Sequence, residues 1–234
     1  MTSTKLSSLS IFMPAYNEEK NIQQTVEEAI QVAQKLAKQY EVIVIDDGSQ
    51  DRTAQKVKSL QTKYPQLRLV RHRSNKGYGA AVKSGLRAAK MDWIFFTDSD
   101  GQFKFDELSG FVAAKDKADL IIGYRRKRMD PFHRVFIAQV LLKLWNRVLF
   151  GLKVKDVDCA YKLFPKKVVQ SIKLETESAI TVTEFLVRAQ RQGYTFCQLP
   201  VTHYPRRHGT QTGGNLKVIL RALKESFVLF RELH

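Results

Sequence analysis

Residues 93–102 read WIFFTDSDGQ, an apolar run that ends in two aspartates separated by one serine. The run 93–97 has the length and composition of a buried strand, and Asp98 and Asp100 follow it directly. Two carboxylates two positions apart can converge on one hard cation such as Mg²⁺ or Mn²⁺. A cation held there can bridge nucleotide phosphates and neutralise a diphosphate as it leaves. The position of the pair after a strand favours a metal site over an ordinary surface turn.

The segments around this run alternate short apolar stretches with amphipathic ones. We predict strands over 9–14, 41–45, 67–71, 93–97 and 120–123, and helices over 21–40 and 79–89. Such alternation is typical of βαβ units, which build a mostly parallel central sheet flanked by helices. In open sheets of this kind, ligands bind at the carboxyl ends of the strands. We therefore predict an α/β fold, organised as a single domain over 1–234.

Acidic motifs also follow the first two predicted strands. PAYNE occupies 14–18, and DDGS occupies 46–49. Both motifs place acceptor groups at the same edge of the sheet as 98–102, where a base and a ribose can be held. DDGS alone fits an ordinary turn or helix cap equally well. Three acidic clusters at three strand ends favour a nucleotide site over three unrelated turns.

Composition limits the class of protein and its setting. The 234 residues, 44% of them apolar and 26% charged, fit one folded domain with a full core. Two cysteines give no disulfide framework and suit a reducing compartment. The first ten residues lack the apolar core of a signal peptide, and no run reaches the ~18 apolar residues of a spanning helix. We expect a cytoplasmic protein that does not cross a membrane by itself.

The net charge of +16 indicates attraction to polyanions, among them nucleic acid, anionic lipid and phosphorylated substrates. Nucleic-acid binding requires basic residues interleaved with aromatic ones in a known module, a pattern that the sequence lacks. Helices predicted over 134–152 and 216–233 have apolar faces bordered by basic residues, which permits contact with a membrane interface. They fit packing on their own domain or on a partner subunit as well. We expect no nucleic-acid partner.

The motifs taken together resemble a known family, glycosyltransferase family 2, and within it the dolichol-phosphate mannose synthase and polyprenyl-phosphate glycosyltransferase branch. The resemblance covers nearly the whole chain and rests on PAYNE at 14–18, DDGSQDRT at 46–53, NKGYGAA at 75–81, DSDGQ at 98–102, GYR at 123–125 and DVDCAYKLF at 156–164. It implies the GT-A nucleotide-diphospho-sugar transferase fold. The nucleotide-binding half would cover about 1–123, and the acceptor half about 124–234.

The resemblance also implies roles for individual residues. The nucleoside would be held at the first two strand ends, by Pro14, Ala15, Tyr16, Glu18, Ile45 and Asp47. The diphosphate would lie at Asp98, Ser99, Asp100 and Gln102, with Mg²⁺ or Mn²⁺ on Asp98, Asp100 and Gln102. Phosphates would be contacted by Arg125, Arg134 and Arg206, whose planar guanidinium groups suit that task. The late segment departs from the mannose synthases, because Thr212 stands where they have a lysine; Arg207 or His208 would have to compensate.

The implied reaction is a single displacement that inverts the sugar's configuration. It would move a hexose from GDP-mannose or UDP-glucose to a polyprenyl or dolichyl phosphate, at the inner face of a membrane with an anionic surface. A phosphate acceptor is already anionic and needs only positioning, whereas a hydroxyl acceptor of a glycan or glycolipid needs a general base. Candidates for that base are Asp156, Asp158 and Glu184, each of which also fits a structural carboxylate. Asp100, Arg125, Asp158 and Glu184 form the predicted catalytic set; no oligomeric state is predicted.

Overall fold

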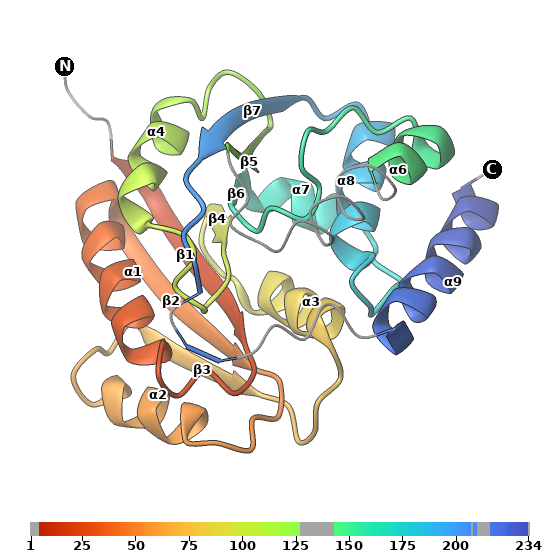
Figure 1. The fold of residues 1–234 in the computed structure, drawn as a ribbon. Coiled ribbons are helices and arrows are strands. Elements are labelled where there is room, and N and C mark those ends of the chain that lie inside the picture. Colours follow the sequence, from red (N-terminus) through yellow and green to blue (C-terminus); the bar gives the residue numbers. More distant parts are fainter. Residues whose placement is uncertain (1–4, 127–142, 207, 210–215, 234) are drawn as a thin grey trace.

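The computed structural model describes residues 5–126, 143–206, 208–209 and 216–233. Its centre is a seven-stranded sheet in the order β3-β2-β1-β4-β6-β5-β7 (Figure 1). The strands are β1 Leu6–Ala15, β2 Ala37–Asp46, β3 Leu67–Arg71, β4 Trp93–Phe96, β5 Leu120–Arg125, β6 Lys162–Pro165 and β7 Phe196–Val201. Only β6 runs antiparallel, to β4 on one side and β5 on the other. The predicted mostly parallel α/β sheet is confirmed.

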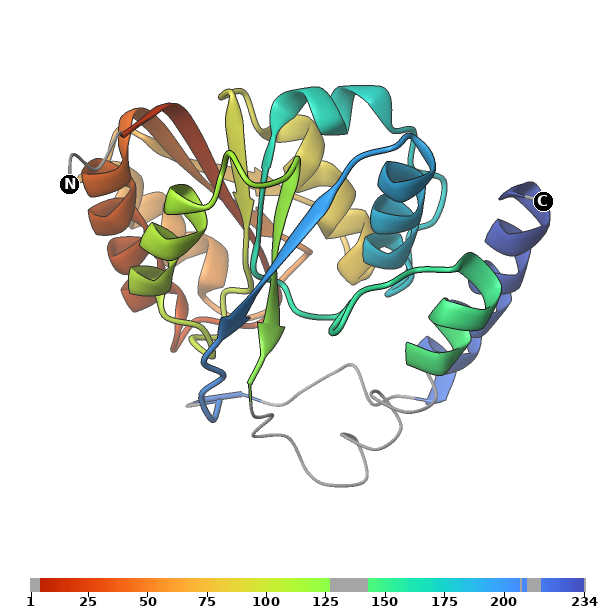
Figure 2. The ribbon, with the colours of Figure 1, turned by 90° about the horizontal axis from the view of Figure 1, so that it is seen from above.

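Helices flank this sheet on both sides (Figure 2). They are α1 Ile22–Leu36, α2 Thr53–Gln61, α3 Tyr78–Ala88, α4 Leu108–Ala113, α6 Lys143–Phe150, α7 Lys166–Ser171, α8 Thr181–Arg191 and α9 Leu216–Leu233, with a short 3-10 helix over Phe105–Glu107. Helix α1 packs on β1 and β2 and contacts α2 and α4, whereas α3 packs on the same strands and contacts α8. None of the described helices combines the length and apolar character needed to span a bilayer.

The core lies where these helices cover β1, β2 and β4. The middle of each of these strands is buried along consecutive residues, as parallel strands under two helical layers require. Phe12 of β1 stacks on Phe96 of β4 with ring centroids 5.0 Å apart. A Cβ on Gly85 of α3 would come within 2.2 Å of the Phe12 ring, so glycine lets the helix approach the sheet closely. This packing fixes the carboxyl ends of the three strands relative to one another.

The predicted C-terminal end of the first helix was wrong. The helix expected over 21–40 stops at Leu36, and residues 37–40 begin β2. They pair in parallel with β1, from Leu6 opposite Ala37 to Leu9 opposite Tyr40. Main-chain bonds to a neighbouring strand outweigh local helical periodicity, which is a weak preference. Of the helix expected over 134–152, only the part from 143 onward is described.

Candidate active site

The three acidic strand ends lie side by side. Strand β1 pairs in parallel with both β2 and β4, so the segments that follow these strands emerge at one edge of the sheet. The backbone N–H of Asp47 donates to the carbonyl of Ala15 at 2.9 Å. The hydroxyl of Ser99 donates to the carbonyl of Pro14 at 2.6 Å. The predicted convergence of these segments is therefore present in the fold.

Asp98 and Asp100 form the negative centre of this edge. Asp98 is half-buried and accepts a hydrogen bond from the Tyr78 hydroxyl at 3.0 Å. Burial and the neighbouring charge of Asp100 raise the pKa of Asp98 to about 7. Asp100 is buried, accepts from the Gln102 backbone N–H at 3.0 Å, and has the Arg206 guanidinium 3.4 Å away. A second positive charge at this position would relieve the repulsion between the two carboxylates.

The donor set fits a hard divalent cation. Carboxylate oxygens are the protein ligands that Mg²⁺ favours, and this ion keeps several positions for water and substrate phosphate. Within the described ranges, no group of three or more histidine, cysteine, aspartate or glutamate side chains is arranged to hold an ion. The two carboxylates would therefore be the acidic ligands, and phosphate and water would take the positions that the chain leaves open. The side-chain nitrogen of Gln102, the third predicted ligand, donates to the Tyr204 carbonyl at 3.0 Å.

Arg206 joins the first and third acidic segments. Its guanidinium pairs with the Glu18 carboxylate as well as with Asp100. Glu18 is buried and also accepts from the Asn21 side-chain amide at 2.6 Å. Burial raises the pKa of Glu18, and the bond from Asn21 and the charge of Arg206 act against that rise. If Arg206 contacts a phosphate, as predicted, its guanidinium would lose its contact with Glu18 or with Asp100.

Asp47 is held by donors from the segment that follows β3. Its Oδ1 accepts from the Lys76 backbone N–H at 2.9 Å and lies 2.6 Å from Nδ1 of His72. Its Oδ2 accepts from the Gly77 backbone N–H at 2.8 Å. Gly77 directly precedes α3, so the carboxylate lies at the positive end of that helix. The carboxylate has a fixed orientation before any ligand binds.

Several other residues shape the predicted nucleoside end. Gly48 has φ +73°, and a Cβ there would come within 2.5 Å of the Ser74 backbone, so the turn needs glycine. Ile45 is completely buried inside β2, which makes it a core residue without an accessible surface for a ligand. Tyr16 is half-buried at the end of β1. The remaining members of the predicted nucleoside set, Pro14 and Ala15, are buried.

Arg125 and Asp156 form a two-bond ion pair. Nε and Nη2 of Arg125 donate to the two carboxylate oxygens at 2.7 and 2.8 Å, and each side chain is 10% exposed. Although burial acts in the opposite direction, the bonds and charge of Asp156 raise the pKa of Arg125 above its usual value. The predicted phosphate-binding arginine is thus oriented by a carboxylate. Arg134 lies outside the described residues.

The structure separates Asp158 from Glu184. Asp158 is exposed, and its charge is among the causes, after burial and Asp98, that raise the pKa of Tyr78. Its charge therefore acts on Tyr78, whose hydroxyl donates to Asp98. Glu184 is completely buried and accepts from the backbone N–H groups of 175 and 176, the Thr176 hydroxyl and Arg188, at 2.7 to 2.9 Å. These contacts match the structural alternative for Glu184, because no oxygen is open to a substrate.

Comparison with known proteins agrees with this geometry. Residues 10–172 match the model of glycosyl transferase family 2. The chain belongs to this family. It is 30% identical to the dolichyl-phosphate beta-glucosyltransferase of Dictyostelium discoideum, over 82% of this chain and 65% of the relative. It is 27% identical to the undecaprenyl-phosphate 4-deoxy-4-formamido-L-arabinose transferase of Edwardsiella ictaluri, over 90% of this chain and 64% of the relative.

The family 2 chain thus spans slightly less than two thirds of the length of these relatives. Among solved structures, it is similar to glucosyl-3-phosphoglycerate synthase from Mycobacterium tuberculosis in complex with Mn²⁺, UDP-glucose and phosphoglyceric acid. The TM-score is 0.70 at 18% identity, covering 94% of this chain and 80% of that one. At this identity the likeness concerns the fold, and it confirms the predicted GT-A architecture.

Lys162, a completely buried lysine on β6, was not among the predicted site residues. Its ammonium group donates to the carbonyl of Val157 at 3.0 Å and to that of Cys159. Burial lowers the pKa of Lys162, while the nearby charges of Asp156 and Asp158 act against that fall. The lysine fixes the loop that carries both aspartates. Its signal in the sequence was a single charge inside an apolar strand.

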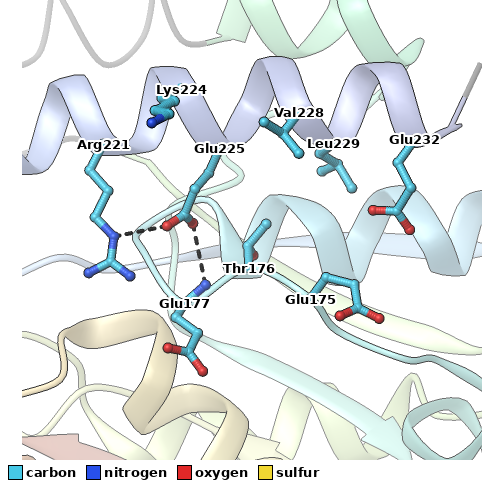
Figure 3. A pocket seen from close by; sticks show the side chains of 9 residues that line it. All are labelled: Glu175, Thr176, Glu177, Arg221, Lys224, Glu225, Val228, Leu229 and Glu232. Carbon is cyan, nitrogen blue, oxygen red and sulfur yellow. Dashed lines mark hydrogen bonds and ion pairs between the residues drawn. The ribbon is translucent and has the colours of Figure 1, made fainter.

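A pocket of about 440 Å³ lies between α9 and the segment 175–177 (Figure 3), and its lining residues are not among the predicted site residues. Charged side chains dominate its lining: Glu175, Glu177, Arg221, Lys224, Glu225 and Glu232. Each of the four glutamates has a cationic partner within 3.6 Å. Because those charges are already compensated, we assign no ligand to this pocket.

Proposed function

We propose that this family 2 protein is an inverting glycosyltransferase that moves a hexose from a nucleotide sugar, GDP-mannose or UDP-glucose, to a polyprenyl or dolichyl phosphate. The observation that carries the proposal is the meeting of three acidic strand ends around Asp98 and Asp100. The names of the two relatives, which act on dolichyl and undecaprenyl phosphates, support a lipid phosphate as acceptor.

The donor would lie along the edge formed by β1, β2 and β4. Asp47 faces the nucleoside end, and Asp98 and Asp100 face the diphosphate. Mg²⁺ or Mn²⁺ on these two carboxylates, with Gln102, would neutralise the charge that develops on the departing diphosphate. Arg206, which lies beside Asp100 and Glu18, would contact the same phosphates.

The acceptor would enter beside Arg125, whose guanidinium is held in place by Asp156. An anionic phosphate oxygen is a sufficient nucleophile when it is positioned next to the sugar, so this reaction requires no strong base. The alternative is a hydroxyl acceptor, with Asp158 as general base. The exposure of Asp158 and its charge effect on Tyr78, the partner of Asp98, favour it over the buried Glu184 for that role.

Helices α6 and α9 suggest how such an acceptor is reached. They contact each other through Phe150 and Phe230, whose ring centroids are 6.4 Å apart, and they lie side by side in both views (Figures 1 and 2). Val148 is 72% exposed and Phe227 55%. Exposed basic residues on the same two helices are Arg147, Arg221, Lys224 and Arg231. An exposed apolar face with basic neighbours suits an anionic membrane surface, here the inner face of a cytoplasmic membrane.

The decisive experiment measures release of UDP or GDP from UDP-glucose and GDP-mannose, with Mn²⁺, and with or without a short polyprenyl phosphate. Wild type is compared with Asp100→Ala. We expect release that depends on the lipid phosphate and disappears in the variant. Release that ignores the lipid phosphate would move the acceptor to a hydroxyl, and absence of donor binding would overturn the proposal.

A further inference from the structure

His72 lies between two residues that belong to different elements. It follows β3, and its backbone N–H donates to the Asp46 carbonyl at 2.9 Å, which continues the pairing of β3 with β2. Its ring Nδ1 lies 2.6 Å from Oδ1 of Asp47, and Nε2 lies 2.8 Å from the hydroxyl oxygen of Ser84 on α3. The His72 side chain is 9% exposed. The proposed function gives neither His72 nor Ser84 a role.

The contacts fix the tautomer of this ring. A carboxylate only accepts hydrogen bonds, so Nδ1 of His72 carries the hydrogen in its bond to Asp47. In the neutral ring Nε2 is then an acceptor, and Ser84 donates its hydroxyl hydrogen to it. A partner on the far nitrogen of an imidazole sets both its tautomer and its orientation. The Asp47 carboxylate thus selects the tautomer, and Ser84 holds the ring in the orientation from which Nδ1 donates to Asp47.

The donors to Asp47 within the described part of the chain leave one acceptor site on its carboxylate. An ionised carboxylate has about four acceptor sites, two on each oxygen. Lys76 and His72 occupy the two sites of Oδ1, and Gly77 occupies one site of Oδ2. The remaining site on Oδ2 can accept one further N–H. Uracil and guanine each carry one ring N–H, whereas cytosine and adenine present an acceptor nitrogen at the corresponding place.

We infer that His72, held by Ser84, is a positioning residue that turns the Asp47 carboxylate toward a ring N–H of the donor's base and so contributes to base selectivity. This inference rests on the proposed function, which places the nucleoside at Asp47. The two other donors to Asp47 are backbone groups of one loop, so His72 is the side chain that ties the carboxylate to α3. Without it, the carboxylate keeps its loop contacts and loses one of the two donors to Oδ1.

The competing explanation is that Asp47, His72 and Ser84 only hold α3 against β2. Binding of separate parts of the donor distinguishes the two explanations. Calorimetric titrations, with Mn²⁺ present, compare UDP with CDP, GDP with ADP, and all of them with pyrophosphate. Members of each nucleotide pair differ at the base, and pyrophosphate has no base. The proteins are wild type, His72→Leu, His72→Asn, Ser84→Ala and Asp47→Asn, each also measured for its melting temperature.

We expect His72→Leu to weaken the preferred nucleotide by about tenfold, the effect of one hydrogen bond to a charged group. Its effect on CDP or ADP is smaller, and pyrophosphate binding stays unchanged. His72→Asn recovers most of the affinity, because its amide nitrogen replaces Nδ1. Ser84→Ala weakens the preferred nucleotide by about threefold and, since alanine suits a helix, carries the test if His72→Leu does not fold.

Two results would overturn the inference alone. One is unchanged nucleotide affinity in His72→Leu while Asp47→Asn loses affinity. The other is an equal loss for both members of a nucleotide pair and for pyrophosphate, which would assign His72 to folding only. If Asp47→Asn itself leaves nucleotide affinity unchanged, the proposed nucleoside site fails and the inference fails with it.

Discussion

Side chains at the acidic strand ends have hydrogen-bond partners within the chain, whereas apolar side chains on α6 and α9 are exposed. At the strand ends Asp47 and Glu18 are buried and accept hydrogen bonds from named donors within the chain. On α6 and α9, Val148 and Phe227 expose more than half of their apolar surface. Preformed polar groups suit a small ligand that must be oriented, whereas exposed apolar groups require a larger partner to cover them.

The two regions are nevertheless connected. Glu225 of α9 accepts from the backbone N–H groups of Glu177 and Ser178, at 3.3 and 3.1 Å. The Glu177 carbonyl in turn accepts from the Ala80 backbone N–H at 3.2 Å, in the first turn of α3. Residues just before and at the start of α3 contact Asp47 and Asp98. The comparison therefore predicts large chemical effects at the strand ends and smaller, surface-specific effects at α9.

The largest effect is expected on removing divalent ions. EDTA should reduce turnover to background, and Mn²⁺ should restore it, because Asp98 and Asp100 then lose the charge that balances the diphosphate. Stabilisation of the protein by the nucleotide, measured as a shift in melting temperature, should disappear with the ion. The melting temperature without nucleotide is the control and should change little. Full turnover in EDTA would contradict the proposed metal site.

Asp100→Ala should reduce turnover by roughly a thousandfold, since metal-assisted charge stabilisation contributes several kcal/mol to the barrier. The measurement is nucleoside diphosphate release at saturating Mn²⁺. Asp116→Asn, at an exposed position, is the matched control and should keep wild-type activity. An Asp100 variant with normal turnover would move the catalytic centre away from this strand end.

Arg125→Met should lower the free energy of unfolding by about 3 kcal/mol, because it leaves the carboxylate of Asp156 without its buried partner. The double variant Arg125→Met/Asp156→Leu should regain part of that loss in urea unfolding. Arg52→Met removes an exposed pair with Glu19 and should leave the unfolding midpoint unchanged. Equal unfolding midpoints for the Arg125 and Arg52 variants would show that the buried pair contributes no more to stability than the exposed pair.

Glu184→Gln should cost about 2 kcal/mol of unfolding free energy, since it weakens several hydrogen bonds to a buried charge. Its turnover per folded molecule should stay at the wild-type level. Glu232→Gln alters the other carboxylate on Arg188, which is largely exposed, and should have little effect on either quantity. A selective loss of turnover in Glu184→Gln would instead revive its role as a base.

Phe227→Glu should have the smallest effect on the protein itself, within about 0.5 kcal/mol of wild-type stability. It should weaken binding to vesicles containing anionic lipid by about tenfold, because a large apolar side chain can no longer enter the interface. Turnover of a short, water-soluble polyprenyl phosphate should not change. Gln66→Glu, exposed before β3, makes the same change in charge and should retain vesicle binding. Equal vesicle binding by both variants would show that Phe227 of α9 does not contribute to membrane contact.

Local patterns predicted much of the architecture and part of the candidate site. The runs at 67–71 and 93–97 became β3 and β4, and the parallel order brought Asp98 next to the first two acidic motifs. Periodicity misplaced the end of α1, because the pairing of residues 37–40 with β1 involves groups far away in the sequence. Sequence alone did not distinguish Glu184 from Asp158 as a candidate base, because both are carboxylates. Their burial separated them.

The sequence by itself determined the alternation of strands and helices, the acidic motifs after three strands, and the family to which these motifs belong. These depend on residues within about one turn or strand of each other, so they can be recognised before folding. Only the tertiary structure decided that Arg206 meets Glu18, 188 positions away, and that His72 joins Asp47 to Ser84. Such contacts depend on how distant segments pack, and burial then fixes which polar groups must find partners.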